Sequence, residues 1–395
     1  MMDAIIIGGG MIVHDQILPS FYQLQRIGLV GEIAVCARRE STLAALEGSD
    51  AIRGAFPGHE FRSCVGSYGE VLTRPIENRP QDATLRDKNK HQGICVVALP
   101  DHLHGGAILR ALECGYDVIS VKPLVLTVAE SVRIENEARQ RGLFVGIEYH
   151  KRFDDRSLMA RRKYRAGEFG EFRLGTAHLM EKWHYRHSNF QNWCTVENSD
   201  AFTYVGCHYV DLVHFITGLD PMAVSVYGVR DKFPNGSEGF LWTDARVIWN
   251  NGACLNVQNS LGYPDDGPGT NTQGLALYCS AGDRGAMLRH SDQYRGLEYV
   301  YSDGRGYAEP SPDYFQYVYL GREGLTPVGY GYRSIEQLVR ACHRVEKSVD
   351  RAKTLREIDE EGILATPANS RHNEGVIEAG RRSILNDGVT VQIKS

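Results

Sequence analysis

The first 150 residues alternate short, β-branched apolar runs with stretches of helical periodicity, and this alternation limits the possible fold more than any other feature. A helical apolar stripe lies at 17–27, and Pro19 should kink or restart that helix. Strands are predicted at 4–7, 32–36, 94–99, 118–121 and 144–148. The pattern predicts βαβ units and a parallel sheet that is covered on both faces.

The sequence pattern changes after residue 150, where longer segments of alternating apolar and polar residues are separated by Gly, Asn and Asp turns. These segments predict antiparallel strands at 243–248, 253–258 and 275–279. Helices are expected at 335–345 and 373–384, before a last strand at 389–393. We therefore predict an α/β protein with a doubly wound parallel sheet in domain 1–150 and a second, α+β domain at 151–395.

Composition excludes several classes of protein. The chain has 44 Lys and Arg against 49 Asp and Glu, a formal net charge of −5, which does not fit a polybasic nucleic-acid binder. Its nine cysteines form no CxxC pair or close cluster, which disfavours a disulfide framework or a zinc site. The first apolar run meets glycine after residue 7, too early for a signal segment or a membrane span. We expect a cytoplasmic protein without nucleic-acid or membrane partners.

Three glycines, Gly8-Gly9-Gly10, close the first predicted strand and precede a helix. A dinucleotide diphosphate binds at such a turn, on the amides that open the helix. Cofactor contacts are therefore predicted at Gly8, Gly10, Met11 and Ile12. Position 13, where a third glycine is usual, is Val13, so a glycine-rich turn without a nucleotide stays an alternative.

The end of the second strand reads Ala37-Arg38-Arg39. NAD-binding sites usually place an acid here to hold the ribose 2′-hydroxyl, whereas Arg pairs with the 2′-phosphate of NADP. Arg38 and Arg39 therefore favour NADP(H) within the NAD(P)(H) class. The alternative is that both arginines simply begin a solvated helix.

Two further strand ends bear polar residues. Pro100 and His104 follow the strand at 94–99, and Lys122, followed by Pro123, ends the strand at 118–121. Ligands of doubly wound sheets bind at the carboxyl ends of the strands, so Pro100, His104 and Lys122 are predicted to line the cofactor. A Lys-Pro pair is also common in solvated turns.

These elements, in order, resemble the Gfo/Idh/MocA oxidoreductase family. Further matching elements are 151–153, 165–170, 206–212, 215–218, 249–253 and 379–383. The resemblance implies an N-terminal Rossmann domain and a C-terminal domain built on a large open, mostly antiparallel sheet. It implies an NAD(P)-dependent enzyme that transfers hydride between nicotinamide and a secondary alcohol or ketone of a sugar, glycoside or cyclitol. It also implies a homodimer or homotetramer, since an open apolar sheet face is unfavourable in water.

The same resemblance assigns catalytic roles. Lys122 would contact the reacting oxygen, and His208 would be the general acid and base, with Asp211 orienting it or the substrate. Two positions depart from the family pattern, because Tyr204 replaces an Asp and Val121 replaces the Glu that precedes the lysine. A purely structural histidine at the start of a helix is the alternative for His208.

Aromatic and imidazole side chains are dense between 178 and 195. Sugars stack on aromatic rings, so Trp183 and His184 are candidate substrate contacts together with Lys151, Tyr204 and Asp211. The same rings could instead pack against a sheet. His184 and His187 are three residues apart, but no carboxylate completes a ligand set, so no metal is predicted.

Two other functions stay open from the sequence. A non-catalytic sensor of the same fold would bind dinucleotide without turnover, although both Lys122 and His208 are present. A sugar-binding scaffold would bind no cofactor, and the absent third glycine is compatible with that.

Overall fold

The computed structural model describes residues 1–72, 92–267, 269, 271–282, 284–291, 301–302, 307–308, 313–321 and 324–393. The chain forms two compact units. Unit 1 contains 1–125, 129–150 and 315–369, and unit 2 contains 126–128, 151–314 and 370–395. The predicted second domain, 151–395, differs from unit 2 because residues 315–369 belong to unit 1.

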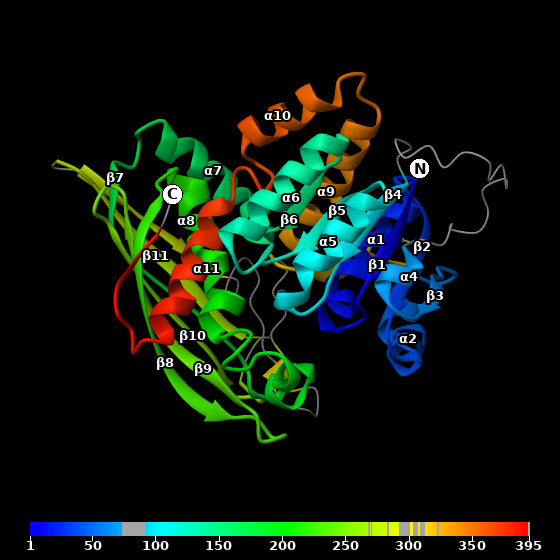
Figure 1. Ribbon diagram of the computed structural model, residues 1–395, viewed down its shortest axis with the longest axis horizontal. Coiled ribbons are helices and arrows are strands. Elements are labelled where there is room, and N and C mark those ends of the chain that lie inside the picture. The colour runs from blue at the N-terminus through cyan, green and yellow to red at the C-terminus, as the bar shows by residue number, and fades with distance from the viewer. Residues whose placement is uncertain are drawn as a thin grey trace. The chain divides into compact units, whose positions relative to one another are not determined.

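Unit 1 is built on a parallel sheet with the strand order β3-β2-β1-β4-β5-β6 (Figure 1). Its strands are β1 (Met2–Ile7), β2 (Val30–Ala37), β3 (Arg62–Val65), β4 (Gly93–Val97), β5 (Tyr116–Val121) and β6 (Val145–Glu148). This is the doubly wound order of dinucleotide-binding domains, and it confirms the predicted parallel sheet. The apolar runs read from the sequence form the buried strands β1, β2, β4, β5 and β6.

Helices connect these strands. They are α1 (Leu18–Arg26), α2 (Glu40–Glu47), α3 (Asp50–Ala55), α4 (Tyr68–Val71), α5 (His104–Glu113) and α6 (Val128–Arg141). A π-helical turn, η1 (Val13–Ile17), precedes α1, and Pro19 lies in the first turn of α1. The chain is helical without a break from residue 11 to 26, so the predicted restart at Pro19 is not seen; the irregularity is the wider π-helical turn that directly precedes α1.

The C-terminal segment of unit 1 explains the difference in domain division. Helix α9 (Tyr330–Glu346) places an apolar stripe in the core of the parallel sheet, with Ile335, Leu338 and Cys342 fully buried. Gly146 on β6 permits this contact, because a Cβ there would lie 2.4 Å from Leu338. Helix α10 (Arg351–Glu361) and the hairpin β15 (Gln316–Tyr319) and β16 (Leu325–Val328) complete the segment. The apolar stripe of α9 thus draws 315–369 to unit 1.

Unit 2 contains a long sheet with the strand order β12-β11-β7-β10-β9-β8-β17. The strands are β7 (Glu171–Lys182), β8 (Pro221–Lys232), β9 (Glu238–Trp249), β10 (Cys254–Tyr263), β11 (Asn271–Ala281), β12 (Arg284–His290) and β17 (Val391–Gln392). Only the β7–β10 pair is parallel among the pairs of this sheet. The mostly antiparallel second sheet expected from the sequence is confirmed. A separate short pair consists of β13 (Tyr301–Ser302) and β14 (Tyr307–Ala308).

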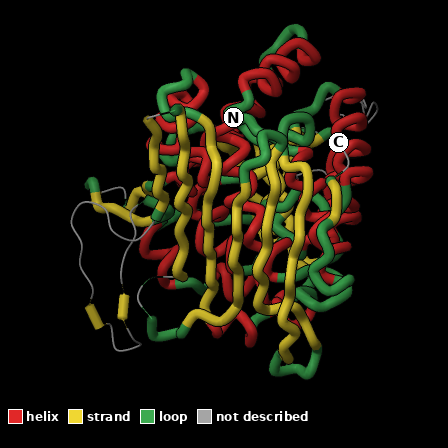
Figure 2. Tube along the Cα trace, turned by 90° about the vertical axis from the view of Figure 1, so that its left-hand side faces the viewer, coloured by secondary structure: helices red, strands yellow, loops and turns green. Residues whose placement is uncertain are grey.

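Helices cover one face of this sheet and leave the other open, as Figure 2 shows. The helices of unit 2 are α7 (Asp155–Arg165), α8 (Cys207–Thr217) and α11 (Arg371–Ile384). Helix α11 is held to β8 by a bond from the Val226 amide to the Ser383 hydroxyl, 2.8 Å. Gly380 lets α11 approach closely, because a Cβ there would lie 3.3 Å from Val226.

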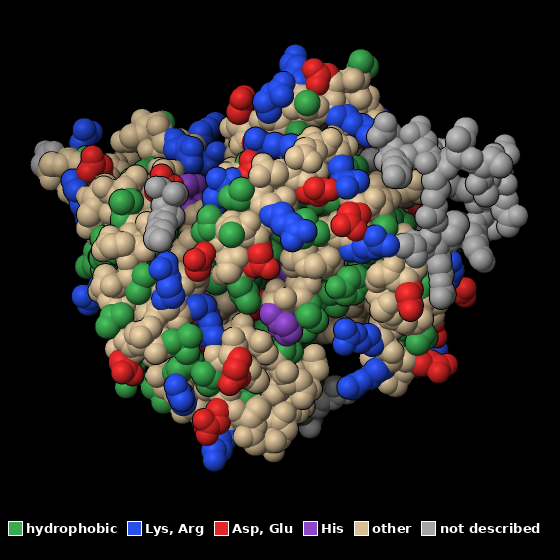
Figure 3. All heavy atoms as spheres, in the orientation of Figure 1, with side chains coloured by type: hydrophobic (Ala, Val, Ile, Leu, Met, Phe, Trp, Pro, Cys, Tyr) green, Lys and Arg blue, Asp and Glu red, His purple; other side chains and the backbone are tan. Residues whose placement is uncertain are grey.

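No helix in the described part of the chain combines the length and the apolar character needed to cross a bilayer. Acidic and basic side chains are interspersed over most of the molecular face shown in Figure 3. This distribution agrees with the near balance of charge in the sequence and differs from the basic stripe of a nucleic-acid binder.

Candidate functional site

The glycine turn that ends β1 has the geometry of a diphosphate cradle. Gly8 has φ +116°, and a Cβ on it would lie 2.0 Å from the carbonyl oxygen of Ala98, so only glycine fits. Its amide donates to the carbonyl of Cys36 over 2.9 Å. A Cβ on Gly10 would meet nothing within 4 Å, so the space beside Gly10 can admit a ligand. The turn therefore fits a dinucleotide diphosphate at the start of the helix.

Val13 occupies the third position of the glycine motif and is fully buried. The helix is π-helical from Val13 to Ile17, which is a wider turn than an α-helical one. Glycine at this position normally allows the helix to pack closely on the strand. Here the wider turn coincides with the branched side chain, and the glycine turn before it keeps its form.

The predicted binding site for the adenosine ribose of the cofactor is at the end of β2. Arg38 and Arg39 are exposed there, and Arg39 precedes α2 as its N-cap. In the described part of the chain neither guanidinium pairs with a carboxylate. Met11 is 37% exposed and Ile12 is half-buried, so both lie at the surface of the glycine turn.

His104, which the sequence predicts as a cofactor contact, joins two loops at the carboxyl edge of the sheet. The ring is completely buried, with Nδ1 2.8 Å from the carbonyl oxygen of Pro123 and Nε2 2.7 Å from that of Leu99. Both ring nitrogens are therefore used in tying the loop after β4 to the loop after β5. His104 shapes the edge of the sheet, and Pro100 beside it is the N-cap of a short 3₁₀ helix, η2 (Asp101–Leu103).

Lys122 follows the last residue of β5 and is half-buried. The Lys122–Pro123 peptide bond is cis. Since β1 and β5 belong to one parallel sheet, Lys122 and the glycine turn lie on the same carboxyl edge. This is the edge at which ligands of doubly wound sheets bind.

The sequence reasoning missed two residues at this edge, Glu148 and His150. Glu148 ends β6 and is 2% exposed, and its carboxylate lies 3.0 Å from Nδ1 of His150. Gln16 Nε2 and Ser334 Oγ also donate to it, over 2.9 and 2.7 Å. A Glu-x-His pattern after a buried strand was the available signal, although the partners Gln16 and Ser334 are visible only in the fold.

In unit 2, His208 lies in the first turn of α8 and is 5% exposed. A π-helical turn, η6 (Phe202–Gly206), leads into this helix. Gly206 is required, because a Cβ there would lie 2.6 Å from Phe202 and 2.7 Å from Asn259. The start of the turn is fixed by Asp200, which accepts from the Thr203 amide over 2.8 Å.

Asp211, which the sequence predicts to orient His208 or the substrate, lies in a buried ion pair. Its carboxylate accepts from Arg152 Nε over 2.8 Å and Nη2 over 2.5 Å, and from Asn373 Nδ2 over 2.9 Å. Both Asp211 and Arg152 are 1% exposed. The carboxylate thus joins α8 to the segment before α7 and to α11.

Two histidines lie beside this ion pair. His214 and His372 are stacked, with ring centroids 3.7 Å apart. Burial lowers the pKa of His372 well below its ordinary value, with further contributions from His214 and Arg152. Burial also lowers the pKa of His214. The pair therefore stays neutral in the folded protein at neutral pH.

Lys151 is buried, 2% exposed, and its Nζ donates to Gln273 Oε1 over 2.5 Å. The amine also lies 5.2 Å from the centre of the Tyr209 ring. The Tyr209 hydroxyl is 3.3 Å from Nδ1 of His290. Lys151 thus belongs to a buried polar cluster of unit 2.

The aromatic segment before α8 lies in short 3₁₀ turns, η4 (Trp183–His187) and η5 (Asn189–Asn192). Trp183 is 43% exposed and covers the guanidinium of Arg186, 3.8 Å from the ring centre. His184 Nδ1 lies 3.1 Å from the Asp265 carboxylate. Tyr204 packs edge-on against Phe190, with centroids 4.7 Å apart. Packing thus accounts for much of the aromatic density, while Trp183 and His184 stay at the surface.

In the described residues, no group of three or more His, Cys, Asp or Glu side chains could hold a metal ion.

Two family models match the chain. Residues 2–149 match an oxidoreductase family with an NAD-binding Rossmann fold, and residues 157–283 match the GFO/IDH/MocA C-terminal domain.

Curated relatives share shorter stretches. Inositol 2-dehydrogenase 1 of Saccharopolyspora erythraea is 29% identical over 138 residues, 35% of this chain and 39% of the relative. The scyllo-inositol 2-dehydrogenase (NAD(+)) of Bacillus subtilis is 30% identical over 76 residues, 19% of this chain and 22% of the relative. The chain thus matches less than half the length of these relatives.

Solved structures resemble the whole chain in fold. GenD2 from gentamicin A biosynthesis, in complex with NAD, has a TM-score of 0.69 at 16% identity, covering 100% of this chain and 97% of that one. The scyllo-inositol dehydrogenase of Lactobacillus casei, with NAD(H) and scyllo-inositol, has a TM-score of 0.64 at 14% identity and covers both chains completely, 100% each. Matches to both domain models, with this shared fold, show that the chain belongs to the Gfo/Idh/MocA oxidoreductase family.

Proposed function

We propose that the protein is an NAD(P)-dependent oxidoreductase that transfers hydride between nicotinamide and a secondary alcohol or ketone of a sugar, glycoside or cyclitol. The observation that carries the proposal is the shared carboxyl edge of the unit 1 sheet, which bears both the glycine turn and Lys122. Membership of an NAD-binding family and the inositol dehydrogenases among its relatives support this choice of reaction.

Nicotinamide, when bound, supplies the hydride acceptor. Lys122 would donate a hydrogen bond to the substrate oxygen and so stabilise the negative charge that develops on it. His208 would take the hydroxyl proton while the C–H electron pair leaves as hydride and the C=O bond forms. The histidine returns the proton in the reverse direction.

The remaining residues would bind the ligands. Gly8, Gly10, Met11 and Ile12 would hold the diphosphate, and Pro100 would line the neighbouring part of the cofactor. On the substrate side, we propose contacts from Lys151, Trp183, His184 and Tyr204. Substrate hydroxyls suit the amine, imidazole and phenol of these side chains, and the exposed ring of Trp183 suits a sugar face.

The cofactor form depends on the end of β2. The Bacillus subtilis relative and the two structures named above bind NAD according to their names. The exposed Arg38 and Arg39 favour NADP(H) in this chain, because a guanidinium pairs with a 2′-phosphate.

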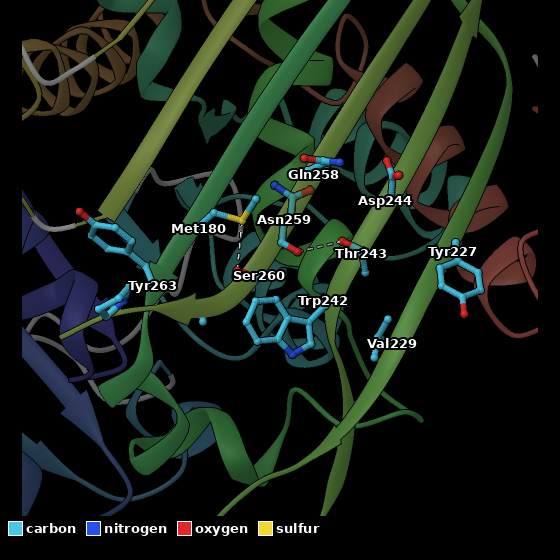
Figure 4. A pocket seen from close by; sticks show the side chains of 12 residues that line it. Met180, Tyr227, Val229, Trp242, Thr243, Asp244, Gln258, Asn259, Ser260 and Tyr263 are labelled. Carbon is cyan, nitrogen blue, oxygen red and sulfur yellow. Dashed lines mark hydrogen bonds between the residues drawn. The ribbon is translucent and has the colours of Figure 1, made fainter. Parts of the chain in front are cut away.

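We also propose that the open sheet face of unit 2 contacts a second copy of the chain. Exposed large apolar side chains gather on this sheet: Leu174, Met222, Tyr227, Val229, Trp242, Tyr278 and Met287. A groove of about 390 Å³ lies on this sheet. Figure 4 shows Trp242 between Met180 on one side and Val229 on the other, with Tyr227 beside Val229. Apolar patches of this kind mark interaction sites in water-soluble proteins.

Charge on the same face favours a two-fold contact. Asp244 and Arg246 are two residues apart on β9 and so point from the same face of the strand. A two-fold axis between two copies would place each residue opposite its complement in the partner. The proposed assembly is therefore a homodimer or a homotetramer built from such dimers.

The experiment that tests the function is a substrate screen with both cofactors. Binding is followed by the fluorescence of NADH and NADPH, and turnover by the absorbance of reduced nicotinamide with inositols, sugars and glycosides. We expect binding of at least one dinucleotide and oxidation of at least one polyol. Binding without turnover of any alcohol would support a redox sensor, and no binding would contradict the proposal altogether.

A further inference from the structure

His208 lies between two anchored side chains on α8. Tyr209 follows it by one residue and Asp211 by three. At 3.6 residues per turn, these two side chains project about 100° to one side of His208 and about 60° to the other. All three residues are buried. The direction in which His208 points therefore depends on what holds its two neighbours.

The anchor on one side is the carboxylate of Asp211. It accepts hydrogen bonds from Arg152 and from Asn373, which join α8 to the segment before α7 and to α11. Contacts along a single edge of a helix still allow the helix to roll about that edge. A second anchor is needed to fix the rotation of the first turn of α8.

The hydroxyl of Tyr209 provides that second anchor. It lies 3.3 Å from Nδ1 of His290 on β12 and 3.5 Å from Oε1 of Gln273 on β11. The Tyr209 side chain is completely buried, and a buried hydroxyl is costly unless it is hydrogen-bonded. The hydroxyl thus ties the first turn of α8 to two strands of the unit 2 sheet.

The partners of this hydroxyl are themselves oriented. Lys151 Nζ contacts Gln273 Oε1 over 2.5 Å, and an ammonium only donates, so the amide oxygen faces the cluster. His290 Nε2 lies 4.0 Å from the carboxylate of Asp154, which favours a proton on Nε2 and leaves Nδ1 as an acceptor. The Tyr209 hydroxyl therefore donates along its shorter contact, to Nδ1 of His290.

We propose that Tyr209 and His290 are positioning residues that set the direction of the His208 imidazole, a role that rests on the proposed function. The hydroxyl of Tyr209 fixes the rotation of the first turn of α8, and His290 fixes the hydroxyl. His208 is then held in its direction before the substrate binds and does not have to be ordered during the reaction.

The first test is Tyr209→Phe, which keeps the ring and removes only the hydroxyl. We expect kcat to fall about 10-fold, because a small misplacement of a catalytic group is costly, while KM and the dinucleotide Kd stay unchanged. Tyr164→Phe is the matched control, since the Tyr164 hydroxyl accepts from the Phe172 amide over 3.0 Å and joins α7 to β7. The control should keep the wild-type kcat. A wild-type kcat in Tyr209→Phe would overturn the proposal.

The second test asks whether Tyr209 and His290 act through one contact. His290→Leu removes the acceptor at Nδ1 and should lower kcat as Tyr209→Phe does, whereas His290→Asn keeps a polar group near the position of Nδ1 and should retain more activity. The double variant of Tyr209→Phe and His290→Leu should lose no more than either single variant. Additive losses, or equal losses in His290→Asn and His290→Leu, would contradict the shared contact.

A third readout does not depend on turnover. In protein with ¹⁵N-labelled histidine, the His208 resonances are assigned from their loss in His208→Gln. We expect Tyr209→Phe to shift or broaden these resonances, because the imidazole is no longer held in one direction, and Tyr164→Phe to leave them unchanged. Unchanged His208 resonances in Tyr209→Phe would overturn the proposal even if no substrate is turned over, an outcome that by itself contradicts only the proposed function.

Discussion

Arg152 holds Asp211 by two nitrogen–oxygen contacts of 2.8 and 2.5 Å, with both side chains buried to 1% exposure. The pair joins η3 (His150–Phe153), which contains Arg152, to helix α8, whose first turn contains His208. The helix that presents the proposed catalytic histidine is thus fixed by a charge pair in the core of unit 2.

Asp211→Asn should destabilise unit 2 strongly. Removing the charge of Asp211 weakens two hydrogen-bonded contacts of the buried Arg152, and breaking a buried pair typically costs about 3–5 kcal/mol. Urea unfolding measured by tryptophan fluorescence checks the value. Glu168→Gln is the control, because the Lys163–Glu168 pair is exposed at 39% and 51% and should contribute less than about 1 kcal/mol. Equal losses of unfolding free energy in the two variants would show that the buried pair stabilises the protein no more than the exposed one.

The stacked histidines should make the protein less stable in mild acid. The pKa of His372 is lowered in the folded state by burial, so below the ordinary value of 6.5 the unfolded chain binds a proton that the folded chain does not. Stability is therefore fully present above pH 6.5 and falls as the pH drops, by about 1.4 kcal/mol per pH unit for each proton. His372→Gln should flatten this slope in denaturation series across this range. An unchanged slope would assign the acid sensitivity to other groups.

Lys122→Ala and His208→Ala should each lower turnover by about 10²-fold or more, the usual scale for a positioned acid or base. Dinucleotide affinity should stay largely intact, since the glycine turn is untouched. Steady-state kinetics with the substrate found in the screen, together with NAD(P)H fluorescence titration, separate the two effects. Wild-type rates in both variants would remove these residues from the proposed mechanism.

Arg38→Ala should weaken NADP(H) binding far more than NAD(H) binding, because the lost guanidinium would pair with the 2′-phosphate alone. The ratio of the two Kd values, measured by titration, is the relevant quantity. Arg53→Ala is a control for loss of an exposed arginine in the same unit, where Arg53 pairs with Asp50 at the surface. Equal losses for the two cofactors would contradict the assignment of Arg38.

Trp242→Glu should disrupt the proposed association of sheet faces. Trp242 lines the groove and is 38% exposed, so the substitution would replace an apolar contact with the partner by a carboxylate that loses its water there. Light scattering coupled to size exclusion should show a smaller species than the wild type. Val349→Glu is the control, since Val349 is fully exposed outside this sheet. A wild-type mass for Trp242→Glu would exclude this face as the contact.

The local patterns were sufficient for five strands of the first sheet, but the edge strand β3 (Arg62–Val65) was not predicted. The run at 94–99 is apolar on every residue because β4 is buried on both faces, and a strand of that kind has no other stable environment. The glycine turn could also be predicted from the sequence. The positive φ of Gly8 and its contact with Ala98 exclude any side chain at that position.

The sequence was a poorer guide where one side chain has several uses. His104 and Asp211 stand in motifs that suggest ligand contacts, yet both are occupied by partners that are far apart in the chain, such as Pro123 and Asn373. The same imidazole nitrogens and carboxylate oxygens can bond either to other parts of the protein or to a ligand. Residue type and spacing could not decide between the two.

The sequence by itself determined the parallel sheet, the glycine turn at its edge and the lysine at the end of β5, because each depends on neighbours within a few residues. Only the tertiary structure decided that 315–369 packs with unit 1 and that Glu148 faces His150 between Gln16 and Ser334. Those contacts join residues that are distant in the chain. Their energies depend on burial and on which donor reaches which acceptor, and neither quantity exists until the chain has folded.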